Sequence, residues 1–214
     1  MRKYLQPGLL ALCATGAALP LFGYAAIQSD HAAAVQSTWK PQEIRYSYMG
    51  FTTAYGCDAI ESRLKSILAT LGAHPQTKVR ASGCLMNRPS RNLFVTITTA
   101  TPVAADEENA ASASTGKGEQ EWLERLGVKS GFTDEPFAAA WKTMDLSQDR
   151  ELDLQPGDCE LMAGLRDHVL PKLAIEVVSD EVRCTPNQLS IVTPELTVSA
   201  LVPLASADEM KAAS

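Results

Sequence analysis

Cysteines are the residues of this chain best suited to specific chemistry, and the sequence contains five of them. Cys13 lies in an apolar N-terminal stretch, and the others are Cys57, Cys84, Cys159 and Cys184. Four cysteines could hold zinc, but structural zinc sites usually contain closely spaced pairs of the form C-x-x-C, which this sequence lacks. The same absence argues against a thioredoxin-like redox motif. We therefore interpret the last four cysteines as structural disulfides.

The spacing of these cysteines predicts how they pair. A helix rises about 1.5 Å per residue, so a helix over residues 57–71 covers roughly 20 Å. An extended segment rises about 3.3 Å per residue, so residues 77–84 return roughly the same distance and bring Cys84 beside Cys57. The same arithmetic applies to the later pair of cysteines. We predict the disulfides Cys57–Cys84 and Cys159–Cys184.

The histidines and carboxylates form no recognisable catalytic motif. His31 lies near the N-terminus, His74 precedes a proline, and His168 follows Asp167. The sequence has no G-x-S-x-G elbow, no H-E-x-x-H pair and no Gly-rich phosphate loop. A Ser-His-Asp site can be assembled from residues that are distant in sequence, so a hydrolase stays open as an alternative. We expect no cofactor and no metal, and we interpret the chain as non-enzymatic.

Charged residues are divided unevenly along the chain. It has 19 Lys and Arg and 25 Asp and Glu, which gives a net charge of −6. Residues 39–103 contain eight basic and three acidic residues, whereas residues 141–204 contain five basic and eleven acidic residues. These regions could face each other, they could be ordinary solvated surfaces, or basic residues could form a patch for an anionic partner. The candidate patch comprises Lys78, Arg80, Arg88 and Arg91. The acidic balance argues against a nucleic-acid partner.

The N-terminal residues have the pattern of a secretory signal peptide. Arg2 and Lys3 precede an apolar stretch at residues 9–21, and small residues follow. We place cleavage after Ala25, with a site after Ala34 as the alternative. An uncleaved anchor would need about 20 apolar residues, and this stretch is shorter. Because no other stretch is long enough to cross a bilayer, we expect no membrane span in the mature chain and a periplasmic or secreted location, where disulfides form.

Patterns of apolar and turn residues predict the elements that surround the first cysteine pair. Residues 43–53 and 93–101 have the β-rich, partly alternating composition of strands. Residues 57–71 carry apolar side chains at helical spacing. Asp58 and Glu61, three residues apart, resemble a capping box at the start of that helix.

A similar order of elements recurs about 100 residues later in the chain. Trp141 follows Trp39 by 102 residues, and Cys159 follows Cys57 by the same number. The second helix should stop or kink near Pro171. These matches indicate the duplication of a strand-helix-strand-strand unit. A chance likeness between common α+β elements is the alternative.

The predicted fold is therefore α+β, with tandem, internally duplicated strand-helix-strand-strand units. Each unit is expected to be a helix on an antiparallel sheet, closed by one disulfide. One pseudo-symmetric sheet with both helices on one face is the alternative, and the length of the linker favours tandem domains. The predicted regions are a signal peptide (1–25), a flexible lead-in (26–38), the first repeat (39–103), a disordered linker (104–118), a short helix with a covering segment (119–140), the second repeat (141–204) and a flexible tail (205–214).

The sequence thus predicts an exported, non-enzymatic α+β protein that acts through binding or envelope assembly. Its expected partner is an envelope protein or an anionic ligand. The alternatives are a secreted hydrolase with a site assembled from scattered residues, and a secreted enzyme inhibitor that presents residues 85–91 as an exposed loop.

Overall fold

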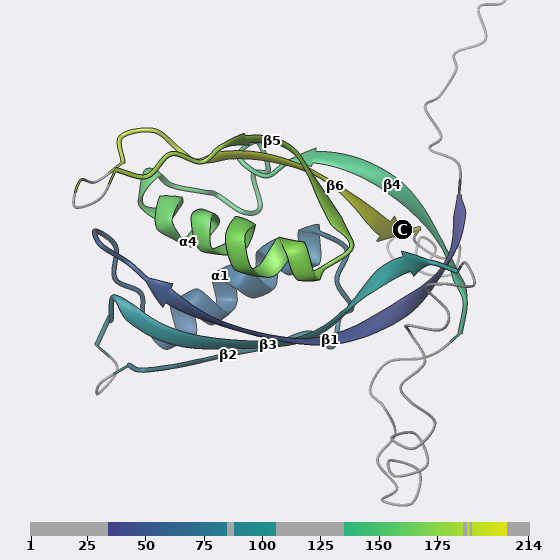
Figure 1. The fold of residues 1–214 in the computed structure, drawn as a ribbon, viewed down its shortest axis with the longest axis horizontal. Coiled ribbons are helices and arrows are strands. Elements are labelled where there is room, and N and C mark those ends of the chain that lie inside the picture. Colours follow the sequence, from purple (N-terminus) through teal and green to yellow (C-terminus); the bar gives the residue numbers. More distant parts are fainter. Residues whose placement is uncertain (1–33, 85–87, 106–134, 186–187, 189, 205–214) are drawn as a thin grey trace, which may run out of the picture. The chain divides into compact units, whose positions relative to one another are not determined.

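Antiparallel strands form one six-stranded sheet with the order β2-β3-β1-β4-β6-β5. The computed structural model describes residues 34–84, 88–105, 135–185, 188 and 190–204. The strands in chain order are β1 (Val35–Met49), β2 (Lys78–Ser82), β3 (Asn92–Ala104), β4 (Phe137–Asp145), β5 (Ile175–Glu181) and β6 (Glu195–Pro203). Figure 1 shows these strands around two helical stretches.

The helical stretches differ in regularity. The first, α1 (Cys57–Thr70), is an ordinary α-helix. The second begins with a 3-10 turn, η1 (Pro156–Asp158), and continues as α4 (Cys159–Gly164), a π-helical turn, η2 (Leu165–Val169), and a 3-10 turn, η3 (Leu170–Lys172). Pro171 lies in the last turn and has no N–H to donate to a preceding carbonyl, so the helix ends there, as expected.

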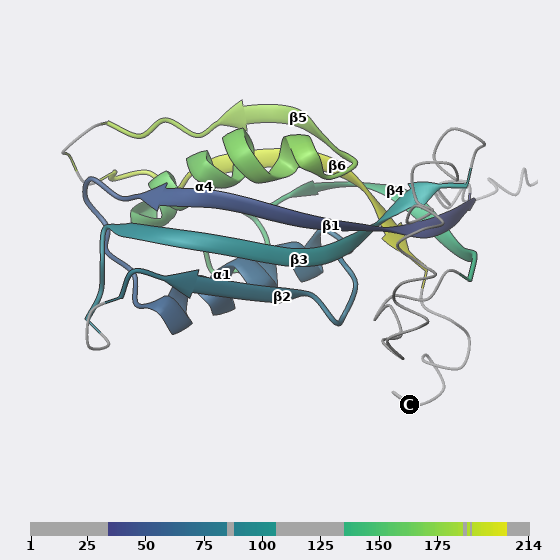
Figure 2. The same ribbon diagram turned by 60° about the horizontal axis from the view of Figure 1, so that its bottom comes forward.

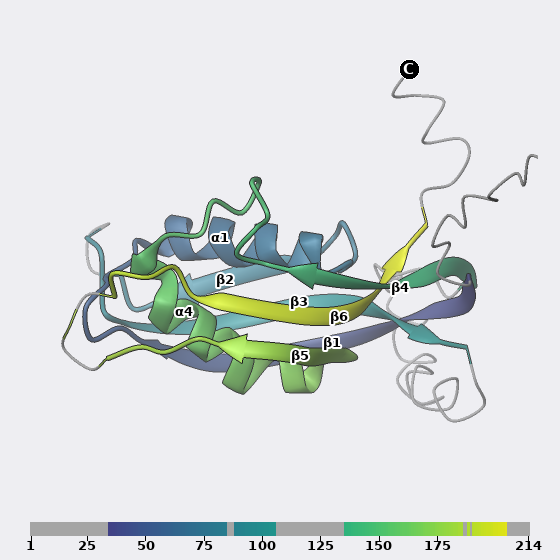
Figure 3. The same ribbon diagram turned by 90° about the horizontal axis from the view of Figure 1, so that it is seen from above.

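The two halves of the sheet lie on opposite sides of the helices. Strands β1, β2 and β3 form one half and β4, β5 and β6 form the other, with α1 and α4 between them (Figure 1). Figure 3, seen from above, shows β5 and β6 in front of β1 and β3. Figure 2 shows α4 beside β1 of the opposite half. The described residues, from Ala34 to Leu204, belong to one compact unit.

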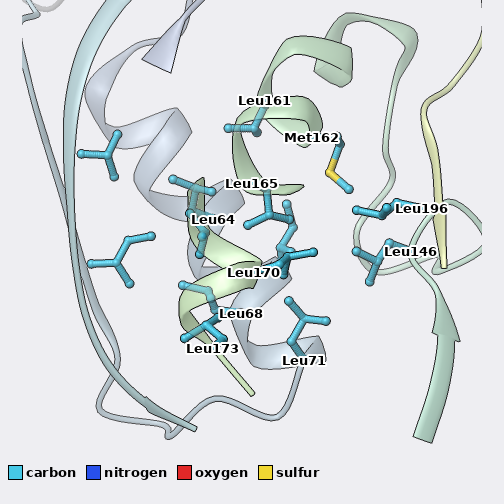
Figure 4. Packing of buried hydrophobic residues seen from close by; sticks show 14 of the residues in the cluster. Leu64, Leu68, Leu71, Leu146, Leu161, Met162, Leu165, Leu170, Leu173 and Leu196 are labelled. Atoms are coloured by element: carbon cyan, nitrogen blue, oxygen red, sulfur yellow. The ribbon is translucent and has the colours of Figure 1, made fainter. Parts of the chain in front are cut away.

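A single apolar core fills the space between the two halves. On α1 the residues at helical spacing are fully buried, and on β1 alternate residues are buried. Figure 4 shows Leu64 and Leu68 of α1 beside Leu165 and Leu170 of the second helical stretch. Each half supplies one helix to the same cluster, so neither half encloses a core by itself.

Both predicted disulfides are present. Cys57 and Cys84 are joined with a Cα–Cα distance of 6.0 Å, and Cys159 and Cys184 are joined at 5.7 Å. Each bridge ties the first turn of a helix to the end of the strand that runs back along it. The geometry is the one that the helix and strand lengths predict.

The arrangement of the sheet differs from the tandem units that we expected. Residues Val35, Gln36 and Ser37 of β1 pair with Ala139, Ala138 and Phe137 of β4, so strands of both units belong to one sheet. These residues fall in the expected lead-in (26–38) and covering segment (119–140), which have weak strand signals. Both halves nevertheless have the same order of elements, strand-helix-strand-strand, and place the equivalent strands in the same order outward from the centre of the sheet.

Other predicted boundaries shift by a few residues or lie outside the described residues. The first strand was expected at 43–53, and β1 ends at Met49. Residue Ala104, the first of the expected linker, is the last of β3. The signal peptide (1–25), the rest of the linker from residue 106, the short helix expected from residue 119 and the tail (205–214) lie outside the described residues. Within the described ranges, every helix is too short or too polar to cross a membrane.

The cap of α1 is also different from the expected one. Its N-cap is Gly56, and no side chain caps it. Glu61, expected to form a capping box with Asp58, instead accepts a hydrogen bond from the backbone N–H of Ala81 at 2.7 Å. Because Ala81 lies on the edge strand β2, this contact ties α1 to the edge of the sheet and satisfies a backbone donor there.

Candidate functional site

Three regions contain side chains that could carry function. They are a pocket at His168, a buried polar network at Asp158, and the side of β1, β2 and β3 that points away from the helices. The pocket has a volume of about 300 Å³ and lies between the end of β1 and α4. Ser47, Glu160 and His168 line it. These are the residue types of a hydroxyl nucleophile, an acid and a base, so this pocket is the candidate site for the hydrolase alternative.

Glu160 is engaged with the backbone of the loop that follows β1. Its carboxylate accepts hydrogen bonds from the N–H groups of Phe51 at 2.9 Å, Thr52 at 3.0 Å and Thr53 at 3.2 Å, and from the Thr52 hydroxyl at 3.1 Å. Successive N–H groups of this kind form a favourable anion site. The carboxylate therefore acts as a clasp between the first half of the chain and α4.

His168 has no catalytic partner within the part of the chain that the structure describes. Its ring lies over the ring of Tyr46, with the centroids 6.3 Å apart. No hydrogen bond joins it to Ser47 or to a described carboxylate. A hydrogen bond from Arg166, at 2.7 Å, holds the pKa of Asp167 below its usual value, so this acid is paired with arginine. The pocket thus gathers suitable residue types without the base–nucleophile contact that acyl transfer uses.

Removing the Glu160 clasp should destabilise the fold without abolishing it. A Glu160→Gln substitution removes the negative charge and one acceptor oxygen, and we expect the free energy of unfolding to fall by about 1–2 kcal/mol. Urea denaturation followed by fluorescence would measure the change. Glu176→Gln, an exposed position on β5, is the matched control and should change stability by less than about 0.5 kcal/mol. Equal effects would contradict the clasp.

The Asp158 network connects the starts of both helices. The Tyr55 hydroxyl donates a hydrogen bond to the Asp158 carboxylate, the Gln155 N–H donates to it at 2.8 Å, and the Arg63 guanidinium lies 3.3 Å away. Arg63 also donates to the backbone carbonyl of Leu152. Burial and then the hydrogen bond to Asp158 raise the pKa of Tyr55 above its ordinary value. Because each of these donors already makes a hydrogen bond or an ion pair within the fold, we infer that the network stabilises the structure.

His74 and the first tryptophan form an aromatic contact at the junction of the halves. Trp39 stacks on Phe137 with centroids 4.6 Å apart, and His74 meets it edge-on at 4.8 Å. Burial lowers the pKa of His74. Trp141 is not part of this stack; it lines a separate pocket with Lys40. Trp39 and Trp141, which stand at equivalent positions in the two halves, therefore lie in separate clusters of side chains.

The predicted basic patch is spread along one side of the sheet. Lys78 and Arg80 alternate with buried Val79 on β2, so both point away from the helices. Neither is ion-paired with a described residue. Arg88 and Arg91 are exposed in the segment before β3, and the Arg91 carbonyl accepts a hydrogen bond from the Gly50 N–H at 2.7 Å. Lys78 and Arg80 thus lie on one face of the sheet, and Arg88 and Arg91 lie towards one end of that face.

Strand register adds residues that the sequence reasoning missed. Thr96 pairs with Arg80 on one side and with Arg45 on the other, which places both arginines in one row. Arg45 also pairs with Glu43 at 2.5 Å. Phe94 lies in the next row, two residues along β3. The position of Phe94 between buried Leu93 and Val95 was the available signal, because it puts a phenylalanine on the polar side of an alternating strand.

Large apolar side chains are exposed at the same end of this face. Phe94 is 65% exposed, Met49 61% and Phe51 51%. Met49 pairs with Asn92 and lies diagonally across from Phe94, on the same face of the sheet. We call the set of Met49, Phe94, Lys78, Arg80 and Arg45 the outward face. It combines apolar and basic groups without a covering segment among the described residues.

Comparison with known proteins gives no further guide. No protein-family model, curated protein or solved structure matches the chain. Among the described residues, no group of three or more His, Cys, Asp or Glu side chains could hold a metal ion. The outward face is the candidate site on the strength of its own chemistry.

Proposed function

We propose that this protein is an exported, non-enzymatic binding protein that docks a partner protein on the outward face during envelope assembly. The observation that carries the proposal is the exposure of Phe94 and Met49 beside basic residues. Aromatic residues, methionine and arginine are enriched where proteins bind each other. The complementary partner would present acidic side chains around an apolar depression.

The chemistry of the outward face suits recognition in two parts. Phe94 and Met49 are exposed and diagonal neighbours, so a partner can remove both from water together. Lys78 and Arg80 lack ion pairs with described residues, so their charges are available to steer an acidic surface. The apolar part would supply affinity and the basic part orientation and rate of association.

Export rests on a separate line of support. The N-terminal pattern is that of a signal peptide cleaved after Ala25, or after Ala34, and disulfides persist in oxidising compartments. The two disulfides agree with such a compartment. The matching order of elements in both halves also supports a duplicated ancestral unit. Periplasmic or secreted location and duplication are parts of the proposal.

Substitutions on the outward face test the proposal. A Phe94→Ser variant, purified with its native disulfides, should retain about a tenth or less of the partner that the wild-type protein captures from the envelope of its native host. Arg80→Glu should mainly slow association, and it should reduce capture less than Phe94→Ser does. Because both side chains are exposed, the unfolding midpoint should not change.

Val178→Ser is the matched control. Val178 is 55% exposed but lies on β5, in the other half of the sheet. It should capture the partner as the wild-type protein does. The proposal fails if Phe94→Ser and Val178→Ser capture equal amounts, or if a photo-crosslinker at position 94 reaches no partner while one at position 178 does.

A further inference from the structure

A second pocket lies where the two halves of the sheet separate. β1 and β4 pair only from Val35 to Ser37 within the described residues, and each strand then continues into its own half. The pocket beyond this junction has a volume of about 420 Å³. Its lining includes Lys40 of β1, Trp141 of β4 and Lys172 of η3. Pockets of this size accommodate small organic molecules.

The charged groups of this pocket are all cations. Among the described lining residues, only Lys40 and Lys172 carry charge, and neither is ion-paired with a described residue. Gln42 adds an amide, whose Nε2 donates to the Thr101 hydroxyl at 3.5 Å. Two ammonium groups without a carboxylate between them favour an anionic guest.

The rest of the lining is apolar and includes a flat aromatic surface. Trp141 is 46% exposed, and no ring of a described residue stacks on it. Trp39, which occupies the corresponding position in the first half, is instead stacked on Phe137. Pro102 and Leu201 complete the apolar wall. An exposed indole beside an apolar wall offers a surface on which a planar group can stack.

We infer that this pocket binds a small organic anion, with its planar apolar part against Trp141 and its anionic group held by Lys40 and Lys172. The side chain of Lys40 lies on the same side of β1 as buried Ile44, whereas the outward face uses the alternate residues. The pocket is thus a second binding site, chemically distinct from the protein-docking face, and its occupancy does not depend on a protein partner.

Naphthalene-2-sulfonate is a suitable probe, because it combines a planar aromatic group with a fixed negative charge. Naphthalene-2-sulfonamide is its neutral counterpart. We expect the full chain, purified with its disulfides, to bind the sulfonate at least ten times more tightly than the sulfonamide in calorimetric titrations. Lys40→Met combined with Lys172→Met should remove this preference, and Trp141→Ala should weaken both compounds, whereas Trp141→Phe should retain most of the affinity.

Lys142→Met is the matched control, since Lys142 is an exposed lysine beside Trp141 that does not line the pocket. It should leave both affinities unchanged. Absence of sulfonate binding overturns the inference, as does equal affinity for the two compounds or unchanged affinity in the double lysine variant. Unfolding midpoints of all variants show that each is folded, and Phe94→Ser, which alters the outward face, should bind the sulfonate as the wild-type protein does.

Discussion

Replacing Asp158 with alanine is expected to lower the free energy of unfolding by about 3–5 kcal/mol. Asp158 is only 3% exposed, and its carboxylate is the common acceptor for the Tyr55 hydroxyl, the Gln155 N–H and the Arg63 guanidinium. Its removal leaves a partly buried guanidinium without its counter-charge and a hydroxyl without its acceptor. Urea denaturation followed by tryptophan fluorescence measures the loss.

Asp158→Asn separates the charge of this side chain from its shape, and a variant at an exposed ion pair is the control. Asp158→Asn keeps an acceptor for Tyr55 but no longer neutralises Arg63, so its effect should be intermediate. Glu181→Ala breaks an exposed ion pair with Arg183, 3.1 Å long, and should cost less than about 1 kcal/mol. If Asp158→Ala and Glu181→Ala had the same effect, the network would not have the structural role that we assign to it.

Loss of the Cys57–Cys84 disulfide should lower the free energy of unfolding by about 3–4 kcal/mol. The bridge joins residues 27 apart in sequence and restricts the unfolded chain, which is the main source of its stabilisation in the chain-entropy model. The double variant Cys57→Ala with Cys84→Ala would be compared with the oxidised wild-type protein in guanidinium titrations. Non-reducing peptide mapping should recover the same pair in the wild-type protein.

The second disulfide provides the comparison for the first. Cys159–Cys184 closes a loop of similar length, with a sequence separation of 25, so the entropic part of its effect should be nearly equal. Cys159 is also part of the core, and its replacement adds a packing cost. We therefore expect the second double variant to be the less stable one. Unchanged unfolding midpoints, or peptides that join Cys57 to Cys159, would contradict the assignment.

Local features of the fold could be predicted from the sequence because they depend on residues that are close to one another along the chain. The helix from Cys57, the strand that returns to Cys84 and the break at Pro171 each depend on residues within about thirty positions of one another. The irregular π-helical turn at residues 165–169 could not be predicted, since its hydrogen-bond pattern depends on packing. The capping pattern at Asp58 and Glu61 was misleading for the same reason.

Contacts between the halves could not be predicted. The β1–β4 junction joins Val35 to Ala139 across about a hundred residues, through segments with weak strand signals. The Glu160 clasp joins this carboxylate to the backbone of Thr52 and Thr53, which is distant in sequence, so it forms only when both halves are folded. Two of the five residues of the outward face, Lys78 and Arg80, could be predicted because they stand in a basic region of the sequence. Strand register was needed to place Arg45, Met49 and Phe94 on the same face.

The edges of the sheet bear on how copies of this chain meet each other. β2 carries Lys78 and Arg80, whereas β5 carries Glu176, Asp180 and Glu181. Two edges of opposite charge could join head to tail between copies of the chain. A contact of that kind repeats without closing and leads to fibres.

Each edge strand has a structural feature that opposes the addition of a strand from another copy. Glu61 occupies the Ala81 N–H on β2, and the register of β5 shifts between Val177 and Ser179. A blocked donor and an irregular strand leave no continuous ladder for an incoming strand. Glu61, which does not cap α1 as expected, thereby helps to prevent a further strand from joining the six-stranded sheet.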